Sequence, residues 1–286
     1  MSEDRDIFVI SDLHMGDGGP RDNFAVGDKE KQLNLLLDFV KNKQGELIII
    51  GDLFEFWQAS LGQVLVNRRS LIDKLTDMGA TFVVGNHDAD LEALIGSAML
   101  GHRFFTKMSR RFIRDINGKK CMFMHGHEVD PYNKGDVPGW GRIATIFAGI
   151  CEDFNRSPVL ETGETVEDWL HKIFRPVEKL FKRIIRPFIR VWNFIKMTFI
   201  IGRHTPAQNP RLAKKMLHLY KDDKLKEGYD VAIVGHTHKA GRFEDWYFNS
   251  GCWAEEVNSF VRISKAGEVE IFDWKDGEAI SNLTEL

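Results

Sequence analysis

The chain has 286 residues, of which 43% are hydrophobic, so it could bury the core of one large α/β domain or of two small ones. Its formal net charge of -3 gives it no general electrostatic attraction for nucleic acid. The three cysteines are few and far apart, which argues against a disulfide framework and favours a reducing compartment.

Short apolar segments alternate with helix-length segments along much of the chain. The apolar segments are rich in β-branched residues and end in polar residues: IFVISDLH (7–14), LIIIGD (47–52), TFVVGNHD (81–88), CMFMHGH (121–127) and VAIVGHTH (231–238). Their continuous apolarity predicts strands that are covered on both faces. Helices are predicted over Lys29 to Lys43 and over Leu61 to Met78. This alternation indicates a largely parallel sheet in an α/β protein.

The C-terminal segments follow a different pattern. WYFNSG (246–251), SFVRIS (259–264) and EVEIFDW (268–274) are predicted to be antiparallel strands. Lys265, Ala266 and Gly267 would join the last two in a hairpin.

A side chain able to bind a metal ion stands at the C-terminal end of every strand predicted to be parallel. A lone histidine at a strand end is more often a satisfied polar residue than a ligand. Five such strand ends are a specific signal, because ligands of open α/β sheets bind beyond the carboxyl ends of the strands. The candidate metal ligands are Asp12, His14, Asp52, Asn86, His125, His236 and His238.

The chemistry of these groups indicates which ions they would bind. Mixed carboxylate, amide and imidazole ligands suit manganese, iron or zinc, and the absence of thiolate argues against a closed structural zinc site. The candidates exceed the needs of one ion, whereas two ions that share Asp52 would use them all. We therefore expect two divalent metal ions as cofactors, with Mn²⁺ favoured over Fe or Zn.

The same residues resemble the five sequence blocks of the calcineurin-like metallophosphoesterases, in order and over residues 7–238. The blocks are Asp12-x-His14, Gly51-Asp52, Gly85-Asn86-His87-Asp88, His125 and Gly235-His236-x-His238. The resemblance implies a four-layer α-β-β-α sandwich of two sheets flanked by helices. It also implies that Asp52 bridges two ions. One ion would be held by Asp12, His14, Asp52 and His238, and the other by Asp52, Asn86, His125 and His236.

Two ions of this kind are expected to hydrolyse a phosphate ester or anhydride. His87 follows the ligand Asn86, so we expect it over the metal pair. There it could protonate the leaving group or stabilise the transition state, and Asp88 would orient it. The alternative is that His87 caps a turn and that Asp88 caps a helix beginning at Ala89.

Two further residues are candidates for binding substrate. His127 repeats the H-x-H spacing with His125, but the seven candidates already fill the metal positions. We therefore expect His127 to support a metal ligand through a hydrogen bond or to contact a substrate phosphate. Trp57, in GDLFEFW, could line a substrate pocket or belong to the core. The carboxylates interpreted as solvated loop residues are Asp17, Glu128 and Asp130.

A narrower resemblance concerns the substrate. GDLFEFW (51–57), MHGHEVD (124–130), a long insertion before VGHTH, and NSGCW (249–253) together resemble the UDP-2,3-diacylglucosamine diphosphatases. Those enzymes cleave a nucleotide-sugar pyrophosphate that bears two acyl chains, during lipid A biosynthesis. The resemblance implies a phosphorylated lipid or a lipid-linked nucleotide sugar as substrate. Its best-known members have arginine where this chain has His87.

Residues 131–209 are predicted to form a helical, basic cap inserted into a core made of residues 1–130 and 210–286. The segment from His171 to Arg203 contains nine Lys and Arg residues and one Glu, so it is strongly basic. An amphipathic basic helix can lie in an anionic membrane interface. The residues proposed to bind substrate or that surface are Arg183, Arg186 and Arg190. The alternative is a lid with its basic residues in solvent.

Three classes of function remain. The first is a metal-dependent hydrolase of a phosphorylated lipid or lipid-linked nucleotide. The second is a soluble phosphodiesterase, nuclease or nucleotidase, for which nucleic acid is disfavoured because few aromatic residues interleave with the basic ones. The third, a non-catalytic binding scaffold, is disfavoured because no ligand is missing. We expect a cytoplasmic protein, peripheral on the inner face of the membrane, with its oligomeric state left open.

Overall fold

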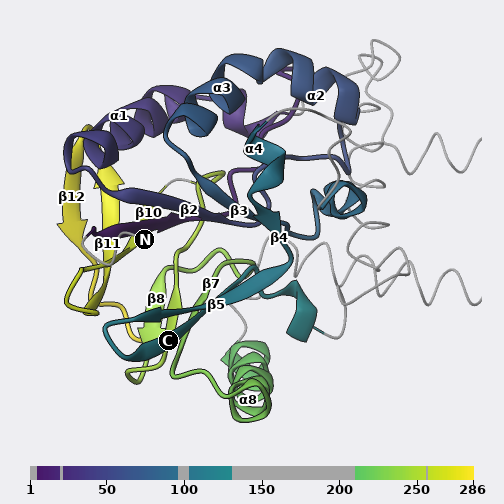
Figure 1. The fold of residues 1–286 in the computed structure, drawn as a ribbon. Coiled ribbons are helices and arrows are strands. Elements are labelled where there is room, and N and C mark those ends of the chain that lie inside the picture. The colour runs from purple at the N-terminus through teal and green to yellow at the C-terminus, as the bar shows by residue number, and fades with distance from the viewer. Residues whose placement is uncertain (1–4, 20–21, 96–102, 131–209, 256) are drawn as a thin grey trace, which may run out of the picture.

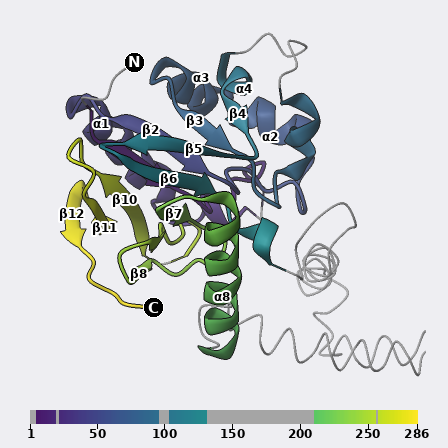
Figure 2. The same cartoon turned by 60° about the horizontal axis from the view of Figure 1, so that its bottom comes forward.

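A computed structural model of the chain describes residues 5–19, 22–95, 103–130, 210–255 and 257–286. Two β-sheets pack face to face, and helices cover their outer faces (Figure 1). The helices α1, α2 and α3 lie over the first sheet, and α8 lies against the second (Figure 2). This is the four-layer α-β-β-α sandwich that the resemblance implies, so the expected fold class is confirmed.

The first sheet has seven strands in the order β12-β11-β10-β1-β2-β3-β4. From β1 to β4 the neighbours are parallel, and from β1 to β12 they are antiparallel. In chain order the strands are β1 (Ile7–Ile10), β2 (Glu46–Ile50), β3 (Thr81–Val83), β4 (Met108–Ser109), β10 (Asn258–Ile263), β11 (Val269–Lys275) and β12 (Glu278–Ser281). The expected hairpin of β10 and β11 is therefore present.

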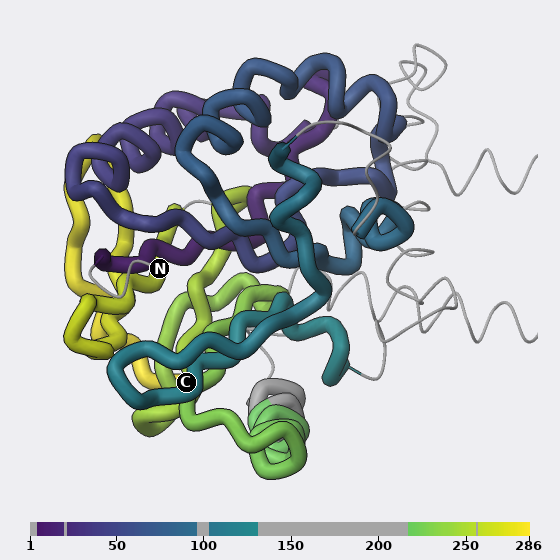
Figure 3. The backbone as a smooth tube through the Cα atoms, viewed as in Figure 1, coloured from purple at the N-terminus to yellow at the C-terminus, as the bar shows by residue number. Residues whose placement is uncertain are grey.

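The second sheet has five strands in the order β5-β6-β7-β9-β8. The chain enters it directly from β4, through a hairpin that appears as a teal tube in Figure 3. The strands are β5 (Arg111–Ile116), β6 (Lys119–Met124), β7 (Val231–Val234), β8 (Gly241–Phe243) and β9 (Tyr247–Asn249). We expected an antiparallel strand at residues 246–251. The strand found there, β9, pairs antiparallel with β8 but parallel with β7.

The helices on the first sheet come from the segments between its parallel strands. The described helices are α1 (Lys29–Asn42), α2 (Leu61–Asn67), α3 (Arg69–Asp77), α4 (Arg103–Thr106) and α8 (Pro210–Glu227), with short 3-10 helices η1 (Asn23–Ala25), η2 (Ala89–Leu94) and η3 (His127–Val129). The helix expected over Leu61 to Met78 is two helices that meet at Arg68. The side chain of Arg68 turns inward, where it pairs with Asp22 and donates to the carbonyl of Gly16.

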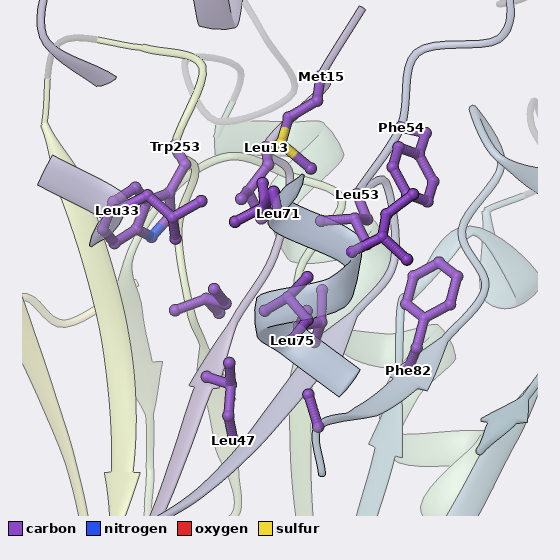
Figure 4. Close-up of a cluster of buried hydrophobic side chains, with 14 of the residues drawn as sticks. Leu13, Met15, Leu33, Leu47, Leu53, Phe54, Leu71, Leu75, Phe82 and Trp253 are labelled. Carbon is purple, nitrogen blue, oxygen red and sulfur yellow. The ribbon is translucent and has the colours of Figure 1, made fainter. Parts of the chain in front are cut away.

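Three hydrophobic clusters hold the four layers together, because alternate residues of a strand point to opposite faces of its sheet. In β1, Phe8 and Ile10 face the helices, whereas Ile7 and Val9 face the second sheet. Figure 4 shows part of the first cluster, including Leu33, Leu71 and Leu75 of the covering helices. The third cluster lies under α8 and includes residues from β6, β7 and β9.

The predicted cap, residues 131–209, lies outside the described residues, and with it lie Arg183, Arg186 and Arg190. The strands on either side of it, β6 and β7, are parallel neighbours in one sheet. The division into core and cap stays a prediction. Among the helices that are described, none is long and apolar enough to cross a membrane.

Candidate metal centre

The predicted ligands lie just beyond the C-terminal ends of five strands from both sheets. Hydrogen bonds between backbone atoms hold the loops after these strands in register. In the first sheet, the N–H of Asp12 donates to the carbonyl of Gly51 at 3.1 Å, and the N–H of His14 donates to that of Asp52 at 2.9 Å. In the second, the N–H of Gly235 donates to the carbonyl of His125 at 2.9 Å. The topology therefore brings together side chains that are far apart in the sequence.

The backbone is left-handed at many of these positions. Nine described residues other than glycine have positive φ, and five of the nine are predicted ligands. Such a conformation costs roughly 1–3 kcal/mol and persists where the surrounding structure enforces it, often at functional sites. The five are Asp12 at 55°, His14 at 48°, Asp52 at 50°, His236 at 68° and His238 at 60°.

Three side chains converge in a first group of possible ligand atoms. The Nε2 atoms of His14 and His238 lie 3.2 Å apart, and Asp12 Oδ1 lies 3.3 Å from Nε2 of His238. One atom from each of the three residues could bind a common ion. Oδ2 of Asp52 lies 3.8 Å from His14 Nε2, at the edge of this group.

A second group surrounds the ring of His125. Its Nε2 lies 3.1 Å from Asp52 Oδ2 and 3.0 Å from Asn86 Oδ1. The same Nε2 lies 3.9 Å from Asp12 Oδ1. Asp52 Oδ2 is thus near both groups, as expected of a carboxylate that is shared by two ions.

The seventh candidate, His236, is near the second group but does not join the atoms that converge in it. Its ring centroid lies 5.1 Å from that of His125. Its Nε2 lies 3.0 Å from Asp130 Oδ2. The structure therefore brings six of the candidate ligands into contact and pairs His236 with a buried carboxylate that was interpreted as a solvated loop residue.

Each predicted histidine ligand has one ring nitrogen that faces an oxygen atom. His14 Nδ1 lies 3.2 Å from Glu55 Oε2, and His238 Nδ1 lies 3.0 Å from Glu255 Oε1. His125 Nδ1 donates to the carbonyl of Ile50 at 2.9 Å. Metal-binding histidines commonly donate their second N–H to such an oxygen, which fixes the tautomer and leaves the other nitrogen for the ion.

The residues also fit a metal site by two independent features. Asp12 Oδ1 is buried and, among the described residues, has no hydrogen-bonding partner, although it faces the histidines. A Cβ at Gly85 would overlap the Asp52 carboxylate, and one at Gly235 would overlap that of Asp12. The glycines of the GNHD and GHTH motifs therefore allow both carboxylates to pack against the loops, and an ion would complete the coordination of Asp12.

Electrostatics keep the two central carboxylates ionised. Burial opposes ionisation, but the neighbouring His125 and His238 outweigh it and lower the pKa of Asp12 to about 2. Burial is likewise outweighed at Asp52, where His125 and His87 hold the pKa well below its usual value. Both side chains are thus anionic over the physiological pH range.

His87 is held by a residue that the sequence analysis missed. The Nδ1 atom of His87 donates to Glu55 Oε2 at 2.6 Å, and its backbone N–H donates to Asp52 Oδ1 at 2.8 Å. Burial lowers the pKa of His87, but Asp52 and Glu55 outweigh burial and raise it. The signal for Glu55 was a carboxylate in the loop that follows the strand of Asp52.

Asp88 binds the backbone, whereas we expected it to orient His87. Its carboxylate accepts hydrogen bonds from the N–H groups of Leu53 at 2.8 Å, Phe54 at 3.2 Å and Gly85 at 2.6 Å. Leaving a buried N–H without a partner costs about 1–3 kcal/mol, so Asp88 stabilises the two loops that carry Asp52 and Asn86. Burial and the nearby Asp52 raise its pKa to about 7.

The two candidates for substrate binding contact different histidines, His127 lying beside His125 and Trp57 beside His87. His127 is buried, and in the part of the chain that the structure describes its Nδ1 has no hydrogen-bonding partner; its ring lies 5.5 Å from that of His125. Burial lowers the pKa of His127 to about 4, so it is neutral at physiological pH. Trp57 stacks on His87 instead of entering the core, with the ring centroids 3.7 Å apart. Their contact with substrate stays a prediction.

Comparison with known proteins gives a family match over most of the chain. A family model described as calcineurin-like phosphoesterase matches residues 6–240. A search of the curated proteins finds no match.

Several solved structures are similar to this one. A single mutant of Vps29 from Entamoeba histolytica has a TM-score of 0.44 at 14% identity, covering 97% of this chain and 99% of that chain. Vacuolar Protein Sorting 29 from Cryptosporidium parvum has a TM-score of 0.44 at 14% identity, and the match covers 99% of this chain and 97% of that chain. A predicted phosphoesterase from Streptococcus pneumoniae has a TM-score of 0.35 at 13% identity, covering 97% and 98%.

Proposed function

Because this chain belongs to the calcineurin-like phosphoesterase family, we propose that it hydrolyses a phosphate ester or anhydride with the help of two divalent metal ions. The observation that carries this proposal is the convergence of histidine and carboxylate atoms at the strand ends, with Asp52 Oδ2 near both groups. Four histidines around it each have one ring nitrogen against an oxygen atom, which leaves the other for an ion.

The two ions would be held by the residues named in the sequence analysis. Asp12, His14, Asp52 and His238 would hold one; Asp52, Asn86, His125 and His236 would hold the other. When bound, the ions would supply a nucleophilic water at neutral pH and neutralise charge on the phosphoryl oxygens. We favour Mn²⁺ among the ions that mixed carboxylate, amide and imidazole ligands suit, and none of the seven predicted ligands is a thiolate.

In the proposed reaction, His87 gives a proton to the leaving group. Its Nδ1 is bound to Glu55, so Nε2 is the ring nitrogen that would carry the transferred proton. The water oxygen forms a bond to phosphorus and releases a proton to solvent, the bond from phosphorus to the leaving oxygen breaks, and that oxygen takes the proton from His87. Glu55 stabilises the protonated ring and also binds His14, so one carboxylate positions both the proton donor and a metal ligand.

The substrate that we propose is a lipid-linked nucleotide sugar similar to UDP-2,3-diacylglucosamine, or a phospholipid. Support comes from the motifs GDLFEFW, MHGHEVD and NSGCW together with the basic amphipathic sequence before VGHTH. Arg183, Arg186 and Arg190 would bind the anionic surface that presents this substrate, with a gain of about 1 kcal/mol for each engaged charge. We therefore propose a peripheral position on the inner face of the membrane.

A substrate panel with the manganese-loaded protein tests this proposal. The panel contains UDP-2,3-diacylglucosamine in anionic vesicles, lysophospholipid, a cyclic nucleotide, single-stranded DNA and a small water-soluble phosphodiester. We expect a lipid substrate to be cleaved fastest, with lower turnover at high salt because salt screens the surface charges. The Arg183→Glu, Arg186→Glu, Arg190→Glu variant should lose turnover of the vesicle substrate and keep that of the small phosphodiester.

A control with the same change in charge places glutamate at Lys31, Lys41 and Arg69, which are exposed on α1 and α3. It should cleave both substrates as the wild type does. If the protein cleaves only cyclic nucleotide or DNA, it is a soluble phosphodiesterase. If the metal-loaded protein cleaves no member of the panel, the non-catalytic scaffold replaces the proposed enzyme.

A further inference from the structure

We propose that Trp57 is a positioning residue that holds His87 in place for proton transfer. The proposal rests on the proposed function, because it requires His87 to be the proton donor. Trp57 lies in the turn between β2 and α2 and is partly buried. Three separate contacts connect it to His87, to the carboxylate that binds His87, and to the adjacent residue Asn86.

The first contact is with the imidazole itself. The indole lies nearly parallel to the ring of His87, at a centroid distance of 3.7 Å and an angle of 22°. The ring of His14 packs nearly perpendicular to the same imidazole, at a centroid distance of 4.5 Å and an angle of 86°. The face of Trp57 that touches His87 is therefore not available to stack on a substrate base.

The second contact fixes the carboxylate of Glu55. The backbone N–H of Trp57 donates to Glu55 Oε1 at 2.9 Å, whereas Oε2 accepts from Nδ1 of His87 at 2.6 Å. Each oxygen of the carboxylate thus has its own donor. A rotation of Glu55 away from His87 would break the bond to Trp57 as well.

The third contact ties together the loops after β2 and β3. The indole Nε1 donates to the backbone carbonyl of Asn86 at 3.0 Å. Next to it, the N–H of Phe56 donates to the carbonyl of His87 at 3.2 Å. Trp57 therefore binds the main chain on one side of the imidazole while its ring covers a face of that imidazole.

Together these contacts restrict the His87 ring. Glu55 fixes Nδ1, Trp57 covers one face, and the ring of His14 packs nearly perpendicular to the imidazole, so few other orientations of the His87 ring are open to it. Proton transfer requires the donor nitrogen within hydrogen-bonding reach of the leaving oxygen. Removal of the indole would widen the range of orientations of the His87 ring. It would reduce the fraction of those orientations in which Nε2 can donate its proton to the leaving oxygen.

Substitutions at Trp57 test this role with two phosphodiesters that differ only in the leaving group. An alkyl leaving group needs a proton, whereas p-nitrophenolate leaves without one. We expect Trp57→Ala to lower kcat for the alkyl ester by about a hundredfold, as a small misplacement of a reacting group does. For the p-nitrophenyl ester the loss should stay within about threefold, because proton donation adds little there. KM should change little in both cases.

The conservative variant and a double mutant separate positioning from general damage. Trp57→Phe keeps a ring against His87 and should recover most of the kcat lost in Trp57→Ala. In a His87→Ala background, Trp57→Ala should have almost no further effect on the alkyl ester, because residues that act as a unit are not additive. Trp246 is a buried tryptophan in the turn before β9, and Trp246→Ala is the control for a lost indole, which should keep the leaving-group dependence of the wild type.

Two kinetic results would overturn the assignment of Trp57: an equal loss of kcat for both esters, or a full additional loss in the His87→Ala background. Metal content of Trp57→Ala, measured by elemental analysis, should equal that of the wild type, and a loss of ions would also contradict the proposal. Failure of the proposed function looks different. In that case the loss of kcat caused by His87→Ala would be the same for the alkyl and the p-nitrophenyl ester.

Discussion

Asp52→Ala protein should lose phosphodiester hydrolysis and bind fewer metal ions than the wild type. Asp52 is buried, and its Oδ2 lies 3.1 Å from His125 Nε2 and 3.8 Å from His14 Nε2, so it serves both groups of ligands. Both ions would lose an anionic ligand. We expect kcat/KM to fall at least about a thousandfold, on the order of 4 kcal/mol of transition-state stabilisation. Steady-state kinetics and elemental analysis measure the two effects.

Two variants control this result. Asp52→Asn keeps the volume and can still accept the backbone N–H of His87, so it tests the lost charge without opening the loop. Asp38→Ala removes an exposed carboxylate of α1 and should leave both activity and metal content unchanged. Full metal content together with normal turnover in Asp52→Ala would contradict the shared-ligand arrangement.

His87→Ala should depress turnover while both ions stay bound. His87 contacts Asp52 and Glu55 through hydrogen bonds, but in neither proposed ligand set does it bind an ion. General acid catalysis contributes about 10²–10⁴-fold, so we expect a loss of that size for substrates with poor leaving groups. For a p-nitrophenyl ester the loss should be small. The measurement is kcat for a series of esters with increasing leaving-group pKa, with metal content determined on the same samples.

His218→Ala is the matched control, because His218 is exposed on α8 in the outer layer of the second sheet. It should behave as the wild type for every ester. If His87→Ala turned over poor and good leaving groups at the wild-type rate, another group would have to supply the proton. Loss of an ion from His87→Ala would instead show that His87 supports the metal site directly.

The ligands could be predicted because they follow from strand ends. Asp12, Asp52 and His125 each come directly after an apolar segment, and parallel strands place their carboxyl ends at one edge of a sheet. The fully buried strands β1 and β7 have four apolar residues each, so their positions could be recognised from composition. The structure adds how the two sheets meet: Asp52 and His125 come from different sheets, and their atoms are 3.1 Å apart.

The groups that orient the ligands could not be predicted in the same way. Glu55 is 41 residues from His14 and 32 from His87, and Asp130 is 106 from His236. A loop carboxylate is solvated by default, and only the folded arrangement reveals its partner. The stacking of Trp57 on His87 depends likewise on how the loop after β2 turns back over the loop after β3.

Some elements of the fold were missed for physical reasons. β5, with the sequence RFIRDI, is an edge strand of the second sheet, and its three charged residues interrupt the apolar pattern. The junction of α2 and α3 looks like continuous helix in the sequence, because Arg68 is a good helix former. Its buried contacts with Asp22 and Gly16 come from the loop after β1, which local sequence does not reveal.

The number of metal ions bound by the wild-type chain tests the account most directly. Purified protein would be stripped with a chelator, reconstituted with manganese, freed of loose metal and analysed for metal and protein together. We predict two ions per chain, because Asp52 Oδ2 lies near both groups of ligand atoms and the buried Oδ1 of Asp12 has no hydrogen-bonding partner within the described residues. A stoichiometry that stays at one or zero after reconstitution would contradict the two-ion mechanism.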